Sequence, residues 1–345
     1  MTNNEIVEKT SRILTNKKEE WERIYERYAN SVVKNKTKYG EHSRCFKINS
    51  PLHKYSSLGK VMSDSKTSTF DLRFAGQSIG TVYVNTDNIH KVKLSVTDKQ
   101  AQYAKEHFGF ENSVELEKEN WDDGNAQRFR SFFQNQETTN SIAIKSEEHR
   151  IENFLLQEFS KKTRKQAKKL CNIRPVRLGG QFFQLTTPLK ASKHDPEYSV
   201  NSKGGATGGG IDVLARVKQK STRFCLTIIE LKDENKKNES QELVMQQALI
   251  YATFIAYLLR SKSGNSWWKI FRENFNECCV PGHLDLNVVS LMPQGESHEG
   301  DMSDIPLKGL NATLHLYTLY YTKDKKGNPK EFFGSLKEAL LLEGK

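Results

Sequence analysis

Two carboxylates and one lysine in the second half of the chain have the residue types and spacing that suit metal-dependent phosphoryl chemistry. Asp212 follows a glycine-rich run at 204–210, and Glu230 and Lys232 close the apolar stretch 225–231. Alternate residues of a strand share a face, so Glu230 and Lys232 are expected to point the same way. If the strand that Asp212 opens pairs with this stretch as a hairpin, both carboxylates and the ammonium converge.

These residue types suit a Mg²⁺ site, in which Mn²⁺ can substitute. Hard divalent cations prefer oxygen ligands, and two carboxylates plus a substrate phosphate supply them. A neighbouring lysine can hold or help to deprotonate a water that attacks phosphorus, while the cation stabilises the developing charge. The alternative for Glu230 and Lys232 is a solvent-facing ion pair at a sheet edge, with Lys232 purely structural.

Gln247 and Tyr251 follow on a predicted helix. Residues four apart lie on one helical face, so both side chains could face the ends of the strands. Gln246 competes with Gln247, because it lies about 100° away around the helix. Tyr251 could also be a core residue with a satisfied hydroxyl, since the helix is so apolar.

The order of these motifs resembles the PD-(D/E)xK phosphodiesterase superfamily, the restriction-endonuclease-like nucleases that include resolvases and repair enzymes. The pattern is Asp212, then Glu230-Leu231-Lys232, then Gln-x-x-x-Tyr from Gln247 to Tyr251. The resemblance covers about residues 145–325. The proline that usually precedes the aspartate is absent.

The resemblance implies a Mg²⁺-dependent endonuclease that cuts DNA, with RNA as the alternative substrate. Asp212 and Glu230 would bind the metal, Lys232 would position or activate water, and Gln247 and Tyr251 would support them. Family members often carry another acidic ligand on the helix before the sheet. Glu152 is the first choice for that ligand and Glu148 the second, with Glu147 and Glu158 as solvated alternatives.

Basic charge favours a polyanionic partner. The chain has 53 Lys and Arg against 42 Asp and Glu, a net charge of +11 and a pI of about 9.2, which indicate nucleic acid. A basic cluster at the end of a predicted helix could contact phosphates or simply be a solvated helix end favoured by the helix dipole. It contains Lys161, Lys162, Arg164, Lys165, Lys168 and Lys169.

The second half predicts an α/β (α+β) fold, a restriction-endonuclease-like mixed sheet flanked by helices in the order αβββαβ. The glycine run lacks the ending of a P-loop and predicts a mobile loop at the mouth of the site. The expected helices are Glu147–Lys169 and Gln241–Arg260, and the expected strands are Gln181–Thr187, Ile211–Val217, Phe224–Leu231, Leu284–Met292 and Ala312–Thr322.

The first half predicts a smaller helical and β-rich domain of recognition or regulatory role, which could also bind a partner protein. Residues 69–96 alternate as an antiparallel meander, and we place the domain boundary near residue 140, giving domains 1–140 and 141–345. One or two amphipathic helices come first, with apolar positions at Ile6, Ile13, Trp21, Ile24 and Tyr28.

Composition bounds the remaining possibilities. The longest apolar stretch, Ala248–Leu259, is shorter than the ~20 residues that span a bilayer, so it predicts a buried helix and no membrane association. Residues 1–18 lack an apolar core, which predicts no signal peptide and a cytoplasmic protein. Five cysteines without a CxxC pair predict ordinary thiols, including Cys278 and Cys279 near His283.

The leading hypothesis is therefore a metal-dependent DNA endonuclease of the kind found in bacterial restriction or antiphage defence. Cutting both strands usually needs two sites, so we expect a dimer or higher homo-oligomer. One alternative is a non-catalytic nucleic-acid-binding or sensing module that keeps the nuclease fold. Another is a structural or interaction protein whose basic charge serves solubility.

Overall fold

The structure is a computed structural model of the chain, and the residues that it describes fall in several ranges. They are 1–35, 46–52, 67–74, 77–85, 92–96, 119–120, 124, 127–128, 147–159, 173–178, 181–191, 195–200, 206–218, 224–233, 239–272, 279–295 and 300–337.

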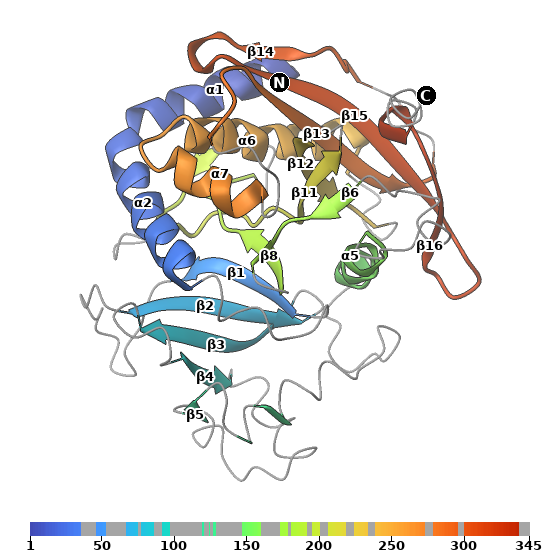
Figure 1. Ribbon diagram of the computed structural model, residues 1–345. Helices are drawn as coiled ribbons and strands as arrows, with labels where there is room; N and C mark the ends of the chain where they lie inside the picture. Colours follow the sequence, from blue (N-terminus) through green and yellow to red (C-terminus); the bar gives the residue numbers. More distant parts are fainter. Residues whose placement is uncertain are drawn as a thin grey trace.

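A mixed sheet forms the centre of the second half of the chain (Figure 1). Its strands are β6 (Ile173–Pro175), β11 (Val213–Lys218), β12 (Phe224–Leu231), β13 (Leu284–Pro293), β14 (Ile305–Leu307), β15 (Ala312–Lys323) and β16 (Pro329–Phe333). Their order is β14-β15-β13-β12-β11-β6, and β16 pairs with β15. β12, β13 and β15 run parallel, and the other neighbours are antiparallel.

Helices cover both faces of this sheet. They are α5 (Glu147–Glu158), α6 (Gln241–Leu259) and α7 (Gly264–Arg272), with a 3₁₀ turn, η3, at Lys308–Leu310. α6 packs on the face that carries Leu214 and Ile228, and α5 packs on the opposite face with Val213 and Ile229. Because both faces are covered, all eight residues of β12 are buried, as its continuous apolar sequence predicts. The predicted mixed α/β architecture, an open sheet flanked by helices, is confirmed.

Two N-terminal helices share the core of the second half. α1 (Asn3–Asn16) packs against α6, and α2 (Lys18–Asn35) packs against α7 (Figure 1). Thr2 and Glu5 form a capping box that fixes the start of α1. The buried rings of Trp21 and Tyr25 meet the edge of Phe254 on α6. The predicted amphipathic helices are confirmed, and their contacts cross the boundary that we placed near residue 140.

A second sheet joins the two halves of the chain. Its strands are β1 (Phe46–Leu52), β2 (Thr67–Phe74), β3 (Gln77–Asn85), β4 (Val92–Val96), β5 (Glu119–Asn120), β7 (Arg177–Leu178) and β8 (Gln181–Leu185). Their order is β5-β4-β3-β2-β1-β8-β7. The antiparallel β2-β3-β4 unit confirms the predicted meander, and β8 pairs in parallel with β1. The short β6 takes the place beside β11.

Several element boundaries were predicted closely and others were not. The predicted Gln241–Arg260 helix and the strands at β12, β13 and β15 match the structure within two residues. The described part of the predicted 147–169 helix ends as α5, and 160–172, with the basic cluster, lies outside the described residues. A two-stranded ladder of β9 (Leu189–Lys190) and β10 (Glu197–Tyr198) was not predicted.

Helix α6 is the one helix, among the described residues, that is long and apolar enough to pass for a membrane span. Most of its length is buried against β13, β12 and α1. This burial agrees with its prediction as a core helix, whose apolar surface is matched by protein.

Candidate active site

The β11–β12 hairpin brings the two predicted carboxylates together. Val213 pairs with Ile229, so Asp212, which immediately precedes β11, lies opposite Glu230. The Asp212 amide donates to Oε1 of Glu230 at 3.4 Å, and the Leu231 amide donates to Oδ2 of Asp212 at 3.0 Å. Strand alternation places both side chains on the α6 face of the sheet, with Leu214 and Ile228.

Glu230 is fully buried, and only one of its two carboxylate oxygens has a hydrogen-bond partner. Its relative exposure is 0%, and its Oε2 atom has no hydrogen-bond partner. Burial raises the pKa of Glu230 well above its usual range, and the nearby charge of Asp212 raises it further. A buried carboxylate beside a second one is electrostatically unfavourable until a cation joins them.

Lys232 is held close to this pair. Its backbone N–H donates to the Leu291 carbonyl at 3.0 Å, and its own carbonyl accepts from the Tyr321 hydroxyl at 3.3 Å. Its Nζ atom lies 3.6 Å from Oε2 of Glu148 and 3.8 Å from Oε2 of Glu239. Burial acts to lower the pKa of Lys232, but the four surrounding carboxylates outweigh it, so the pKa is raised and the side chain is an ammonium.

The acidic residues of α5 divide into different roles. Glu147 binds Arg150 and Lys323, and the Arg150 hydrogen bonds lower the pKa of Glu147 to about 2. Glu148, the next residue, contacts Lys232 instead. Glu152 is buried, yet no group of three or more His, Cys, Asp and Glu side chains in the described ranges is arranged to hold a metal ion. Glu152 as a third ligand therefore stays a prediction.

Gln247 and Tyr251 lie on the site side of α6. Their side chains are hydrogen-bonded to each other, and the pKa of Tyr251 is raised, first by burial and then by the charges of Glu230 and Asp212. The competing Gln246 donates instead to the carbonyl of Met1 at 2.7 Å. The structure therefore brings Gln247 rather than Gln246 beside Tyr251, close to the two carboxylates.

The described part of the glycine run, residues 206–210, forms a strap that is hydrogen-bonded to the backbone at 187–189, and its mobility stays a prediction. The Gly208 amide donates to the Thr187 carbonyl at 3.0 Å, and the Gly209 amide donates to the Leu189 carbonyl at 2.9 Å. A side chain at Gly209 would overlap the Tyr251 hydroxyl. The glycines are needed because backbone approaches backbone and the tyrosine here. Residues 201–205 lie outside the described residues.

Replacing Gly209 with alanine should therefore destabilise the fold. The added methyl group collides with Tyr251, a buried ring on a packed helix, so we expect a loss of about 1–3 kcal/mol of unfolding free energy. Chemical denaturation measures this change. Gly309→Ala is the matched control, because a Cβ there meets no atom within 4 Å, and equal stability of the two variants would contradict the strap.

Sequence reasoning missed several residues of the site. Gln184 on β8 donates to the carbonyl of Ile211 at 3.0 Å, directly before Asp212. Glu239, seven residues further along, and Tyr321, from a distant part of the chain, contact Lys232. For Glu239 the available signal was its position just before Ser240, which caps α6. No local pattern points to Tyr321 or Gln184.

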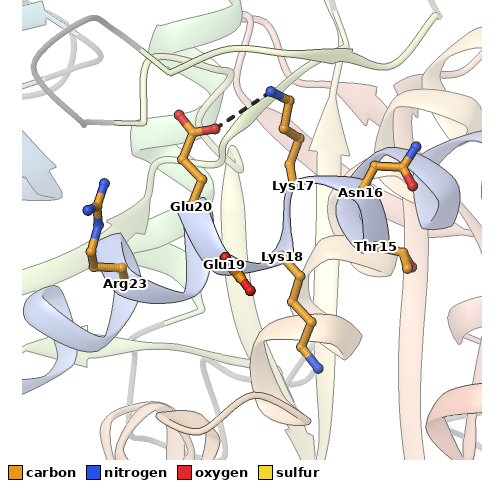
Figure 2. A pocket seen from close by; sticks show the side chains of 7 residues that line it. All are labelled: Thr15, Asn16, Lys17, Lys18, Glu19, Glu20 and Arg23. Carbon is orange, nitrogen blue, oxygen red and sulfur yellow. Dashed lines mark ion pairs between the residues drawn. The ribbon is translucent and has the colours of Figure 1, made fainter.

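A separate open pocket of about 750 Å³ lies at the corner between α1 and α2. Figure 2 shows its side chains, in which Lys17 pairs with Glu20. The lining contains cations and anions in near balance and none of the predicted site residues: Thr15, Asn16, Lys17, Lys18, Glu19, Glu20 and Arg23. This pocket therefore gives no support to an anion-binding role.

Cys279 is exposed, and His283 contacts Asn311, Thr313 and Asp285. Cys278 lies outside the described residues, so the absence of a metal site at these cysteines stays a prediction.

Comparison of the chain with protein-family models, with curated proteins and with solved structures found no match.

Proposed function

We propose that the chain is a Mg²⁺-dependent phosphodiesterase that hydrolyses DNA. The observation that carries the proposal is the pairing of Asp212 with Glu230 on a buried hairpin, where one Glu230 oxygen lacks a hydrogen-bond partner. A buried carboxylate oxygen that lacks a hydrogen-bond partner and lies beside a second carboxylate is a suitable ligand for a cation.

The side chains present fit such a cation. Asp212 and Glu230 would hold it, through the hard oxygen ligands that Mg²⁺ prefers, and substrate phosphate and water would complete its shell. When bound, Mg²⁺ would supply positive charge that stabilises the phosphate as negative charge develops on it. Mn²⁺ has the same ligand preference and should replace it.

The chain's own residues would then bind and orient the substrate. The Lys232 ammonium would hold a phosphate oxygen or the attacking water by a charge-assisted hydrogen bond. The Tyr251 hydroxyl, which Gln247 orients, would donate to the phosphate from the helix side. Burial of Glu230 and Lys232 would exclude water and so strengthen each of these interactions.

The order of elements also supports a restriction-endonuclease-like core. α5 precedes three antiparallel neighbours, β6, β11 and β12, and α6 then leads to β13, which is parallel to β12. The strands of the central sheet support the expected αβββαβ order if β6 takes the place of the predicted 181–187 strand and the short elements between them are left aside. We therefore include this fold in the proposal.

Incubation with DNA tests the proposed activity. Purified protein with supercoiled plasmid or single-stranded DNA should cut at least one of them in Mg²⁺ or Mn²⁺, and EDTA should stop the reaction. Single-stranded RNA in parallel distinguishes the alternative substrate. Binding of DNA without a cut in either cation would support the non-catalytic module instead.

A further inference from the structure

Lys232 lies between two carboxylates that the proposed reaction does not use. Glu148 comes from α5, on one face of the central sheet, and Glu239 comes from the segment directly before α6, on the other. The lysine side chain is 6% exposed, while those of Glu148 and Glu239 are 18% and 24% exposed. The two acids therefore flank a nearly buried ammonium.

Only the backbone of Lys232 is fixed by the sheet. The Leu291 carbonyl and the Tyr321 hydroxyl hold its main chain, but four side-chain torsions still separate that backbone from the ammonium. Lysine loses about 2 kcal/mol of rotamer entropy when its head is held in one place. The carboxylates of Glu148 and Glu239 are the acids that lie within 4 Å of the ammonium.

The position of Glu239 follows from the start of α6. Ser240 is the N-cap, with an extended backbone and a side chain that accepts from the Leu243 amide at 3.4 Å. The cap fixes the direction in which the chain enters the helix. The same helix presents Gln247 and Tyr251 to the carboxylate pair, so α6 places both the tyrosine and one partner of the lysine.

The ammonium lies near all four carboxylates, but its ion pairs within 4 Å are with Glu148 and Glu239. Glu230 is only two residues from Lys232, yet its Oε2 atom is buried and has no hydrogen-bond partner. Within the described ranges, the ion pairs of Lys232 join it to Glu148 and Glu239, not to Glu230. An ammonium without these partners would move to Glu230, because a buried cation takes the nearest available carboxylate.

We propose that Glu239 is a positioning residue, which together with Glu148 holds the Lys232 ammonium off Glu230 and keeps the Asp212–Glu230 pair open to a divalent cation. The proposal rests on the proposed function, because it takes this pair as the cation site. It adds that cation affinity depends on a residue that is not itself a ligand. The role of Glu239 is carried through the lysine.

Because Glu239 would act through Lys232, its role can be distinguished from that of a direct ligand. If Glu239 neutralises Lys232, then losing its charge should weaken cation binding only while the lysine is present. If Glu239 bound the cation itself, the loss would be the same with or without the lysine. A double-mutant cycle separates the two cases, since it isolates the coupling between two residues.

The test measures Mn²⁺ binding to the full-length protein without nucleic acid, by the electron paramagnetic resonance signal of free Mn²⁺. We expect Glu239→Gln to weaken Mn²⁺ binding about five- to tenfold, the effect of losing one partly buried ion pair. In the Lys232→Met background, the same substitution should change the affinity by less than about twofold. Glu242→Gln, three residues along and exposed, is the matched control and should bind as the wild type does.

Other outcomes overturn the proposal. An equal loss in both backgrounds would make Glu239 a ligand, and an unchanged affinity in Glu239→Gln would leave it no role. Should Glu239→Gln fail to fold, Glu148→Gln takes its place in the same cycle, because it removes the other partner of the ammonium. Wild-type protein that binds no Mn²⁺ would end the proposed function as well, whereas a wild type that binds and an unaffected variant would end this inference alone.

Discussion

We expect alanine at Asp212, Glu230 or Lys232 to abolish the proposed DNA cleavage, with a loss of roughly 10³-fold or more at each position. Asp212 and Glu230 are the two carboxylates that the hairpin brings together, and we propose them as the oxygen ligands. Lys232 is the ammonium beside them. Each removal takes away a charge that stabilises the transition state more than the bound substrate.

The measurement is the single-turnover rate of plasmid cleavage in Mg²⁺, with thermal unfolding to confirm that each variant is folded. Lys232→Met serves beside Lys232→Ala, because methionine keeps an apolar stem in the buried position. Exposed Glu242→Ala and Lys269→Ala are the matched controls for acid and base. Wild-type rates in all three site variants would show that the reaction occurs elsewhere.

Glu230→Gln should make the protein more stable in the absence of divalent cations. The carboxylate is fully buried, lies beside Asp212 and leaves one oxygen without a hydrogen bond. The amide has the same shape, spares the cost of burying or protonating a carboxylate beside Asp212, and can donate to Asp212. We expect a gain of about 2 kcal/mol, which corresponds to a rise of roughly 4 °C in Tm.

Thermal unfolding in EDTA and then in excess Mg²⁺ measures this effect. The wild type should gain stability when Mg²⁺ is added, since a ligand that binds only the folded state raises Tm. Glu230→Gln should show little further gain. A lower Tm for Glu230→Gln in EDTA would mean that the carboxylate stabilises the fold. That result would contradict the view that Glu230 lowers stability and is present for cation binding.

Glu230 differs from the core residues around it. Neighbouring positions on β12, such as Ile228 and Ile229, are apolar and buried on their two faces. Glu230 interrupts that pattern at the end of the strand. A local conflict between burial and charge is common at functional sites, where stability is lost in favour of binding.

The parts of the site that local patterns encode were predictable from sequence. Alternation and the turn between two apolar stretches placed Asp212 opposite Glu230, because a hairpin is a short-range structure whose register follows from its own residues. The helical spacing of Gln247 and Tyr251 likewise predicted a shared face. The structure agrees with both expectations.

Long-range contacts were not predictable in this way. Glu148 and Tyr321 reach Lys232 from segments 84 and 89 positions away, which no periodicity reports. The choice between Gln246 and Gln247 depended on which side of α6 meets Met1. Both questions are decided by how elements dock, and one sequence carries little information on docking.

Strand pairing explains the remaining differences in the fold. Gln181–Leu185 is a clear strand from its composition, but nothing in it specifies β1 as the parallel partner. β6 has three residues, too few to show a period, although it is the strand that completes the central sheet beside β11. The amphipathic pattern of α1 predicted a buried face but not that α6 would cover it.

The most direct test of the central claim is anomalous diffraction from crystals soaked in Mn²⁺. We expect a Mn²⁺ peak within bonding distance of carboxylate oxygens of both Asp212 and Glu230, with the Lys232 ammonium nearby but not bound to the ion. If crystals soaked in saturating Mn²⁺ keep the hairpin intact but show no peak at these two carboxylates, the proposed cation site is wrong.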